Sequence, residues 1–272
     1  MKNLVIGSEG FVGRPLCHYL EQRGEQVVHF DIKRGDHEDG RHVQVPLEGV
    51  DRVYFLAWEV GGAKYLYRDE SQLAQLDWNL ALMKNVFRQL READVPFLFV
   101  SSQLAQAVDT VYGATKRLGE VWTHLLPKGV CVRLWNVYGS YEDSTERSHV
   151  AADFVHQALD NGRIEMMTTG EERRQFVHID DTCRAFHAAL SQGVRAIHDV
   201  STFEWVRVLD VANIIGELTG AEVVPGTKVG STPITPNLAP VPGWKAEVGL
   251  REGLARMMEE FRRRKKDRPA IG

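Results

Sequence analysis

A tyrosine and a lysine stand four residues apart, at Tyr112 and Lys116, within a helical pattern. Side chains at this spacing lie on one face of a helix, about one turn from each other. A lysine ammonium in that position stabilises phenolate over phenol and lowers the tyrosine pKa from its usual value of about 10. The pair could therefore supply a general base that works near neutral pH.

Three glycines, Gly7, Gly10 and Gly13, follow an apolar segment at the start of the chain and precede a helical pattern. Gly7 permits a tight turn, Gly10 lets a phosphate approach the backbone, and Gly13 allows close packing of helix on strand. The helix N-terminus offers N–H groups and a positive partial charge to that phosphate. We therefore expect this turn, with Phe11 and Val12, to bind the pyrophosphate of a dinucleotide cofactor.

A second apolar segment, at 26–30, is followed by Asp31 and Ile32, which we expect to contact the cofactor. A carboxylate at this strand end can accept both hydroxyls of an adenosine ribose and would repel a 2′-phosphate, which favours NAD. Lys33 and Arg34 could instead accommodate such a phosphate, so NADP is possible. The alternative is that Asp31 only begins a turn.

Apolar segments and helical patterns alternate through the first half of the chain. Strands are expected at 3–6, 26–30, 52–57, 97–101 and 130–134, and helices at 13–23, 72–92 and 111–126. This alternation predicts an α/β fold with a doubly wound parallel sheet of the Rossmann type. Later, the sequence suggests helices at 150–161, from 181 and at 250–263, strands near 165–168 and 175–178, and a proline-rich loop at 232–242.

We therefore expect a dinucleotide-binding domain at 1–148 and a smaller, mixed α/β substrate-binding lobe at 149–272, with the chain able to cross back between them. The composition, with 43% hydrophobic and 26% charged residues, is that of a folded globular protein. A net charge of −4 gives no reason to expect nucleic acid as a partner. No segment approaches membrane-spanning length and no signal-peptide pattern opens the chain, so we expect a cytoplasmic protein.

Two further features bear on metals and partners. Three widely spaced cysteines support neither a disulfide framework nor a metal site. The helical pattern at 72–92 carries one apolar stripe that includes Leu73, Leu80 and Phe87, while Trp78 and Leu82 belong to a second stripe with Val86. One stripe is enough to pack a helix on a sheet, so the second suggests a homodimer, or else packing under a neighbouring loop.

Taken in order, these motifs resemble the extended short-chain dehydrogenase/reductase family of nucleotide-sugar epimerases, dehydratases and reductases. The resemblance runs from Lys2 to about Glu260. Besides the glycine turn, Asp31 and the Tyr112/Lys116 pair, it rests on Phe55-Leu56-Ala57, Asn79, Val100-Ser101-Ser102, residues 133–139 (RLWNVYG), residues 174–181 (RQFVHIDD) and Gly243-Trp244-Lys245.

The resemblance implies catalytic and binding roles. Tyr112 would be the acid/base, Lys116 would hold the nicotinamide ribose, and Ser102 would hydrogen-bond the reacting oxygen. Ser101 is the alternative for the serine role and a further cofactor contact, because the strand end is not fixed to one residue. The remaining implied contacts are Leu56, Ala57 and Trp135 with the cofactor, and Asn136 and Arg174 with the substrate's diphosphate.

A loop with two glycines, Val60-Gly61-Gly62, resembles a substrate loop of the family's GDP-sugar enzymes, and His149 falls where some of these place a histidine acid. A histidine at a helix start can equally be structural. Gln103 and Leu104 stand where related 3,5-epimerases carry a cysteine and dehydratases carry acidic residues, which weakens both of those mechanisms.

The set of Ser102, Tyr112 and Lys116 favours hydride transfer at a secondary alcohol of a nucleotide sugar. The leading hypothesis is an NAD-dependent epimerase that acts through a transient 4-keto sugar. The alternatives are an NAD(P)H-dependent reductase (or 3,5-epimerase/reductase) of a GDP-4-keto sugar, and a nucleotide-binding sensor without turnover. The sequence identifies neither the sugar nor its nucleoside.

Overall fold

The computed structural model of the protein describes residues 1–61, 65, 69–143, 145, 147–232 and 235–267. Its centre is a six-stranded parallel sheet in the order β10-β5-β4-β3-β1-β2. The strands are β1 (Lys2–Ile6), β2 (Gln26–Phe30), β3 (Arg52–Phe55), β4 (Phe97–Ser102), β5 (Gly129–Leu134) and β10 (His198–Val200). All five strands expected in the first half are present, and the predicted fold class is confirmed.

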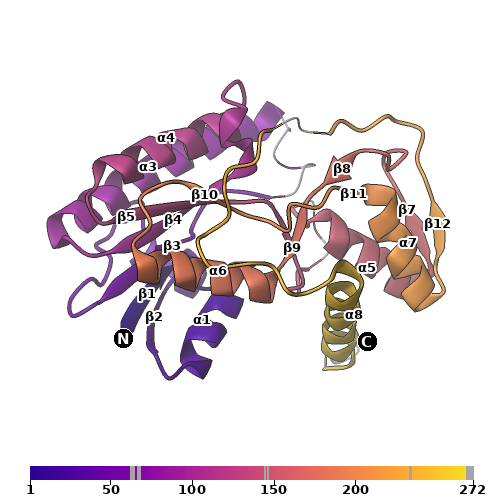
Figure 1. Ribbon diagram of the computed structural model, residues 1–272, viewed down its shortest axis with the longest axis horizontal. Coiled ribbons are helices and arrows are strands. Elements are labelled where there is room, and N and C mark those ends of the chain that lie inside the picture. Colours follow the sequence, from indigo (N-terminus) through magenta and orange to yellow (C-terminus); the bar gives the residue numbers. More distant parts are fainter. Residues whose placement is uncertain (62–64, 66–68, 144, 146, 233–234, 268–272) are drawn as a thin grey trace.

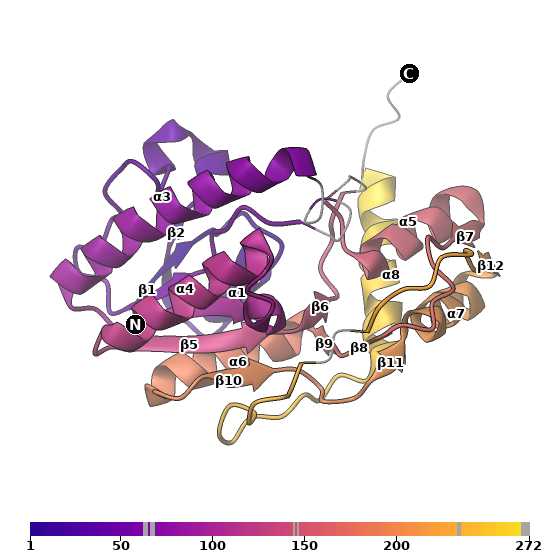
Figure 2. The same cartoon turned by 90° about the horizontal axis from the view of Figure 1, so that it is seen from above.

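Helices cover both faces of this sheet (Figures 1 and 2). α1 (Gly13–Gln22) and α6 (Ile179–Gln192) pack on one face, and α3 (Asp69–Ala93) and α4 (Val111–Leu125) on the other. Alternate strand residues point to opposite faces. In β1, Val5 joins the α1/α6 core while Leu4 and Ile6 join the α3 core, so both sides of the strand are buried. Because both faces of β1 are buried, apolar residues stand at consecutive positions in this strand.

The second lobe has its own core, to which Phe154, Ile215 and Met257 contribute. β6 pairs with β9 and β7 with β12 in parallel, whereas β8 pairs with β11 antiparallel. Its elements are β6 (Asn136–Tyr138), α5 (Val150–Asn161), β7 (Arg163–Glu165), β8 (Arg173–Arg174), β9 (Phe176–His178), β11 (Val206–Arg207), α7 (Val208–Thr219), β12 (Glu222–Val224) and α8 (Leu250–Asp267).

The chain crosses between the two cores more than once. α6 follows β9 and packs back on the main sheet, and β10 pairs with β5, with His198 opposite Val132. The segment after residue 149 is therefore divided between the sheet and the second lobe. Three short 3-10 helices lie in connecting segments: η1 (Ile32–Arg34), η2 (Asp36–Glu38) and η3 (Gln103–Gln106).

Some elements differ from the sequence-based expectation. The strand expected near 165–168 is instead β7, at Arg163–Glu165. The sequence did not indicate α7, nor the short strands β6, β8, β10, β11 and β12, each of two or three residues. Strands this short span about one period of alternation, whereas the pattern is recognised over four to eight residues.

The second apolar stripe of α3 is covered within the protein itself and is not left on the surface for a partner subunit. Leu82 and Val86, expected on the second stripe, are buried in the protein's own core, and the Arg41 guanidinium lies 3.4 Å from the Trp78 ring centroid. These three residues thus pack under the neighbouring 40–45 segment. Among the described residues, the large apolar side chains exposed on α3 are Leu73 and Leu80, and those exposed on α4 are Leu118, Val121 and Leu125.

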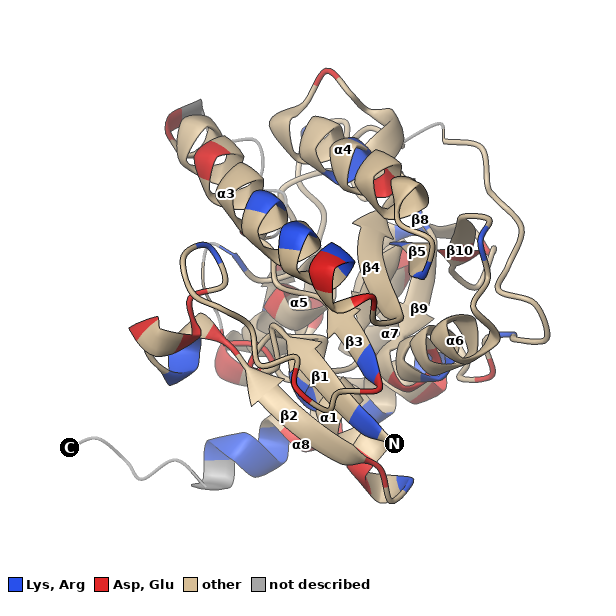
Figure 3. Cartoon of the chain, turned by 90° about the vertical axis from the view of Figure 1, so that its left-hand side faces the viewer, with Lys and Arg blue, Asp and Glu red and all other residues tan. Residues whose placement is uncertain are grey.

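In Figure 3 the ribbon of the last turns of α8 is blue, the colour of lysine and arginine. Arg263 and Arg264 there pair with Glu260.

Among the helices that the structure describes, none has both the length and the apolar character to cross a membrane.

Candidate active site

A cleft of about 1230 Å³ opens at the C-terminal ends of β1, β3, β4 and β5. Parallel strands bring the residues that follow them to this edge, which is where α/β sheets bind ligands. The cleft is lined by these residues singled out in the sequence: Gly7, Gly10, Phe11, Val12, Gly13, Asp31, Ile32, Leu56, Ala57, Val60, Gly61, Ser101, Ser102, Tyr112, Lys116, Trp135 and His149.

The glycine turn is packed so closely against other backbone that Gly7 and Gly13 have no room for a side chain. A Cβ on Gly13 would lie 1.9 Å from the Gly7 carbonyl oxygen. Gly7 has φ +96°, and a Cβ there would lie 2.6 Å from the Ala57 backbone nitrogen. Val12 precedes α1 without a side-chain cap, so the helix N-terminus faces the cleft without a side-chain acceptor. This geometry fits a phosphate held by backbone N–H groups.

Asp31 is embedded in a network of carboxylates at the end of β2. Its two oxygens accept hydrogen bonds from the Lys33 and Glu9 backbone amides, each at 2.9 Å. The Glu38 carboxylate accepts the Asp31 backbone N–H at 2.8 Å and pairs with Arg34 at 3.1 Å. The Arg34 guanidinium is thus already paired with the Glu38 carboxylate. A carboxylate retains further lone pairs, so Asp31 can still accept ribose hydroxyls.

Lys116 and Tyr112 both line the cleft, and the Lys116 side chain is buried. Lys116 Nζ donates to the Val100 carbonyl oxygen at 2.8 Å and lies 3.9 Å from the Trp58 ring centroid and 5.9 Å from that of Tyr112. Burial lowers the pKa of Lys116 to about 7, because the charged form is removed from water.

The two serines at the end of β4 have different environments. Ser101 Oγ donates to the buried Glu120 carboxylate at 2.7 Å, and Glu120 also pairs with Arg133 at 2.7 Å. Burial raises the pKa of Glu120, but the hydrogen bonds from Arg133 and Ser101 outweigh it and hold that pKa below its usual value. Among the residues that the structure describes, Ser102 Oγ makes one hydrogen bond, which it accepts from the nearby Leu104 amide at 3.1 Å. The Ser102 hydroxyl proton thus remains available to a substrate.

His149 stacks on Phe11 of the glycine turn, with ring centroids 5.1 Å apart. Its Nδ1 lies 3.0 Å from a Glu142 carboxylate oxygen, and its backbone N–H donates to the same carboxylate at 2.7 Å. A carboxylate at Nδ1 orients the ring and favours a proton on that nitrogen. Sequence reasoning missed Glu142, since nothing in the spacing of residues 142 and 149 indicates this contact.

A polar cluster that the sequence did not indicate joins the loop after β3 to the segment before α5. Arg147 pairs with Glu59 at 2.7 Å, and its guanidinium lies 4.1 Å from the Tyr65 ring centroid. Tyr65 also hydrogen-bonds Glu59. Glu59 and Arg147 line the cleft beside Gly61. Gly62, expected to contact substrate, lies outside the described residues.

Two residues that the resemblance assigned to the substrate's diphosphate have other contacts. Asn136 Nδ2 donates to the Gln175 carbonyl oxygen at 3.1 Å, and Arg174 Nη1 donates to the Ser231 carbonyl oxygen at 2.9 Å. Within the described part of the chain, neither is among the residues lining the cleft. Their role in binding a diphosphate therefore remains a prediction.

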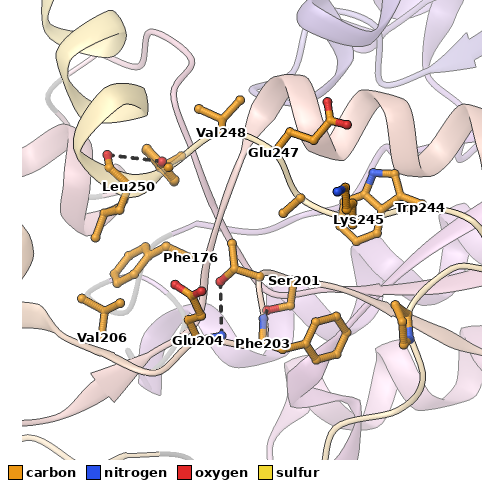
Figure 4. Close-up of a pocket in the computed structure, with 15 residues that line it drawn as sticks. Phe176, Ser201, Phe203, Glu204, Val206, Trp244, Lys245, Glu247, Val248 and Leu250 are labelled. Atoms are coloured by element: carbon orange, nitrogen blue, oxygen red, sulfur yellow. Dashed lines mark hydrogen bonds between the residues drawn. The ribbon is translucent and has the colours of Figure 1, made fainter.

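A smaller pocket of about 360 Å³ lies between β9, the segment after β10 and the segment before α8 (Figure 4). Phe176, Phe203 and Trp244 line it, with Lys245 and Glu247. Phe203 has φ +64°, a conformation that bulky residues rarely adopt. Among the described residues, this pocket shares no lining residue with the larger cleft, so it is separate from Tyr112 and Lys116.

The parallel sheet and the glycine turn at its edge define a Rossmann-type α/β protein. The chain belongs to the NAD dependent epimerase/dehydratase family, whose model matches residues 3–200. This confirms the resemblance to the extended short-chain dehydrogenase/reductases, and the protein is an NAD-dependent enzyme of that type.

Curated relatives include reductases. The chain is 31% identical over 192 residues to the UDP-2-acetamido-2,6-β-L-arabino-hexul-4-ose reductase of Pseudomonas aeruginosa, an alignment that covers 68% of the chain and 48% of the reductase. The chain thus spans about half the length of that relative. It is 25% identical over 268 residues to the dTDP-4-dehydro-6-deoxy-D-allose reductase of Streptomyces sp, covering 80% of the chain and 81% of the reductase.

Solved structures share the fold. The NAD-dependent NDP-hexosamine 5,6-dehydratase TunA matches with a TM-score of 0.83 and 19% identity, covering 98% of this chain and 99% of that one. The UDP-glucose 4-epimerase of Thermotoga maritima, solved with UDP-glucose, matches with a TM-score of 0.80 and 21% identity, covering 97% and 100%. At these identities the likeness concerns the fold alone.

Proposed function

We propose that the protein is an NAD-dependent nucleotide-sugar epimerase that acts through a transient 4-keto sugar. The observation that carries this proposal is a single cleft lined by the glycine turn, Ser102, Tyr112 and Lys116. A general base, a hydroxyl donor and a cation then act on one ligand beside a nucleotide-binding turn. Membership of the NAD dependent epimerase/dehydratase family supports the same assignment.

The residues present fit NAD. The space over Gly10 and Gly13 suits a pyrophosphate, and Asp31 suits the diol of an adenosine ribose. Glu9 and Glu38 beside Asp31 add negative charge where a 2′-phosphate would lie, which favours NAD over NADP. When bound, NAD supplies the nicotinamide ring that accepts and returns a hydride.

In this proposal Tyr112 removes the proton from the sugar's 4-hydroxyl as the carbon–hydrogen bond at C4 breaks. The Lys116 ammonium stabilises the phenolate form of Tyr112. Ser102 donates a hydrogen bond to the oxygen that becomes the ketone. The keto sugar then rotates within the cleft so that its opposite face is presented to the cofactor. C4 regains its hydrogen on that face, and Tyr112 returns the proton to the oxygen. The epimerisation is redox-neutral overall.

The substrate contacts are proposed at the sugar end of the cleft. Val60 and Gly61 would approach the sugar ring, and His149, held by Glu142, would donate to one of its substituents. Asn136 and Arg174 are proposed contacts to the diphosphate, which would require Arg174 to leave the Ser231 carbonyl. The second lobe would bind the nucleoside.

A reductase of a nucleotide 4-keto sugar is the second candidate. The relative at 31% identity is a reductase of a UDP-linked hexul-4-ose. The His149–Glu142 pair also supports this candidate, because a carboxylate-held histidine can act as an acid. The same Tyr112 would then donate a proton to the ketone oxygen, and reduced cofactor would be consumed.

One incubation series separates these functions. Purified protein is mixed with UDP-glucose, UDP-N-acetylglucosamine, dTDP-glucose or GDP-mannose, each with and without added NAD, and products are resolved by anion-exchange chromatography and NMR. The epimerase predicts a C4 epimer with no change in NADH absorbance. NADH oxidation with a 4-keto sugar, and no interconversion of any saturated sugar, would instead establish the reductase. A sensor would show nucleotide binding and neither reaction.

We also propose a homodimer. Leu73 of α3 and Leu125 of α4 are 69% and 72% exposed, and Leu80, Leu118 and Val121 add to the apolar surface of these helices. Light scattering after size exclusion tests this proposal. Leu73→Glu combined with Leu125→Glu should give a monomer, and an unchanged mass would contradict it.

A further inference from the structure

The Lys116 ammonium lies in an unusually apolar environment. Its Nζ is 3.9 Å from the Trp58 ring centroid and 5.2 Å from that of Phe99, and the residue is only 5% exposed. Among the described residues, the Val100 carbonyl oxygen, at 2.8 Å, is its one hydrogen-bond acceptor. A cation with a single acceptor needs another source of stabilisation in such a site.

Few countercharges face this ammonium. From α4, Glu120 and Tyr112 face it, but Glu120 is committed to Arg133 of β5 at 2.7 Å. Cys131 of β5 is buried, and burial raises the pKa of its thiol beyond the physiological range. Burial lowers the pKa of Lys116 to about 7, while Cys131 and Glu120 act in the opposite direction. The electrostatic support from ionised neighbours is therefore small.

Trp58 is placed to provide the missing support. It lies three residues after the end of β3 and lines the cleft, and its ring packs against Phe99 with centroids 5.5 Å apart and an interplanar angle of 61°. This contact leaves the face of the indole toward Nζ. Among aromatic side chains, the indole face attracts cations most strongly, and the attraction grows when the pair is desolvated.

We propose that Trp58 is a positioning residue that keeps the Lys116 ammonium charged and directed toward Tyr112. The role of that ammonium in activating Tyr112 rests on the proposed function, whereas the Trp58–Lys116 interaction does not. Replacing the indole with an aliphatic side chain keeps the site apolar but removes the attraction. A larger fraction of Lys116 then loses its proton at neutral pH.

The test is an NMR titration of lysine side chains labelled at Cε and Nζ in the full chain, with the Lys116 signal assigned by its loss in Lys116→Met. Trp58→Leu should lower the pKa of Lys116 by about 1, and Trp58→Phe by less. Trp122→Leu is the matched control, because Trp122 stacks on Phe87 at 5.3 Å in the same aromatic cluster and should leave the titration unchanged.

An unchanged Lys116 titration in both folded Trp58 variants would overturn the proposal. The titration does not depend on turnover, so it decides the role of Trp58 even if no nucleotide sugar is converted. Where activity is found, the alkaline limb of kcat/KM in Trp58→Leu should move to lower pH by the same amount as the titration.

Discussion

Replacing Lys116 by methionine should change how the stability of the protein depends on pH. The Lys116 side chain is buried in the folded protein, and its pKa falls from 10.5 to about 7 because burial penalises the ammonium. In the unfolded chain the same lysine keeps its ordinary pKa. Between these two values the unfolded state binds more protons than the folded state, so stability should rise with pH. Methionine has no such proton and removes this dependence.

The size of the effect follows from the two pKa values. Each pKa unit corresponds to about 1.4 kcal/mol. At pH 6 the lysine is protonated in both states, and its burial costs about 5 kcal/mol. At pH 9 the folded form has lost the proton and the cost falls to about 2 kcal/mol. From pH 6 to pH 9, the free energy of unfolding should therefore rise by about 3 kcal/mol more in the native protein than in Lys116→Met.

Urea denaturation of the cofactor-free protein at pH 6, 7, 8 and 9, followed by circular dichroism and by tryptophan fluorescence, measures this difference. Lys84→Met is the matched control, because Lys84 is exposed on α3 and should give a curve parallel to the native one. If the native and Lys116→Met curves are also parallel across this pH range, the argument from burial is wrong.

Four further substitutions test the site. Ser102→Ala should lower kcat/KM by about 10²-fold with little loss of stability. Ser101→Ala should instead lower the free energy of unfolding, measured in urea, by about 1–3 kcal/mol, because the buried Glu120 carboxylate loses a donor. The reverse pattern would exchange the roles of the two serines. Gly13→Ala should abolish NAD binding in calorimetry, since its Cβ would lie 1.9 Å from a carbonyl oxygen, while Gly249→Ala, with open space around it, should bind normally. Asp31→Ala should weaken NAD at least tenfold and leave NADP nearly unaffected, and equal losses for both would contradict the ribose assignment.

The nucleotide-binding half of the fold could be predicted because its signals are local. Strands β1, β3, β4 and β5 are mostly apolar and mostly buried, whereas the edge strand β2 is only partly buried. The glycine turn and the Tyr112/Lys116 pair depend only on short spacings. Thr110, whose hydroxyl accepts the Gly113 amide at 3.0 Å, marks the start of the helix that carries this pair.

The remaining features depend on contacts between distant segments. Nothing near Glu142 in the sequence indicates its contact with His149, and Glu59 meets Arg147 across the cleft. The periodicity of α3 shows that Leu82 is on an apolar face, but it cannot show that the 40–45 segment covers that face. In the same way, the motif around Asn136 does not reveal that the Asn136 side chain donates to the carbonyl oxygen of Gln175, the residue before β9.

The fate of hydrogen at C4 tests the central claim most directly. A nucleotide sugar that the protein interconverts is deuterated at C4 and incubated with the native protein and with Tyr112→Phe in ordinary water. The account predicts an epimer that retains its C4 deuterium, formed by Tyr112→Phe about 10²–10⁴-fold more slowly although NAD binding is unchanged. Loss of the deuterium to solvent, or an undiminished rate without the phenolic hydroxyl, would contradict it.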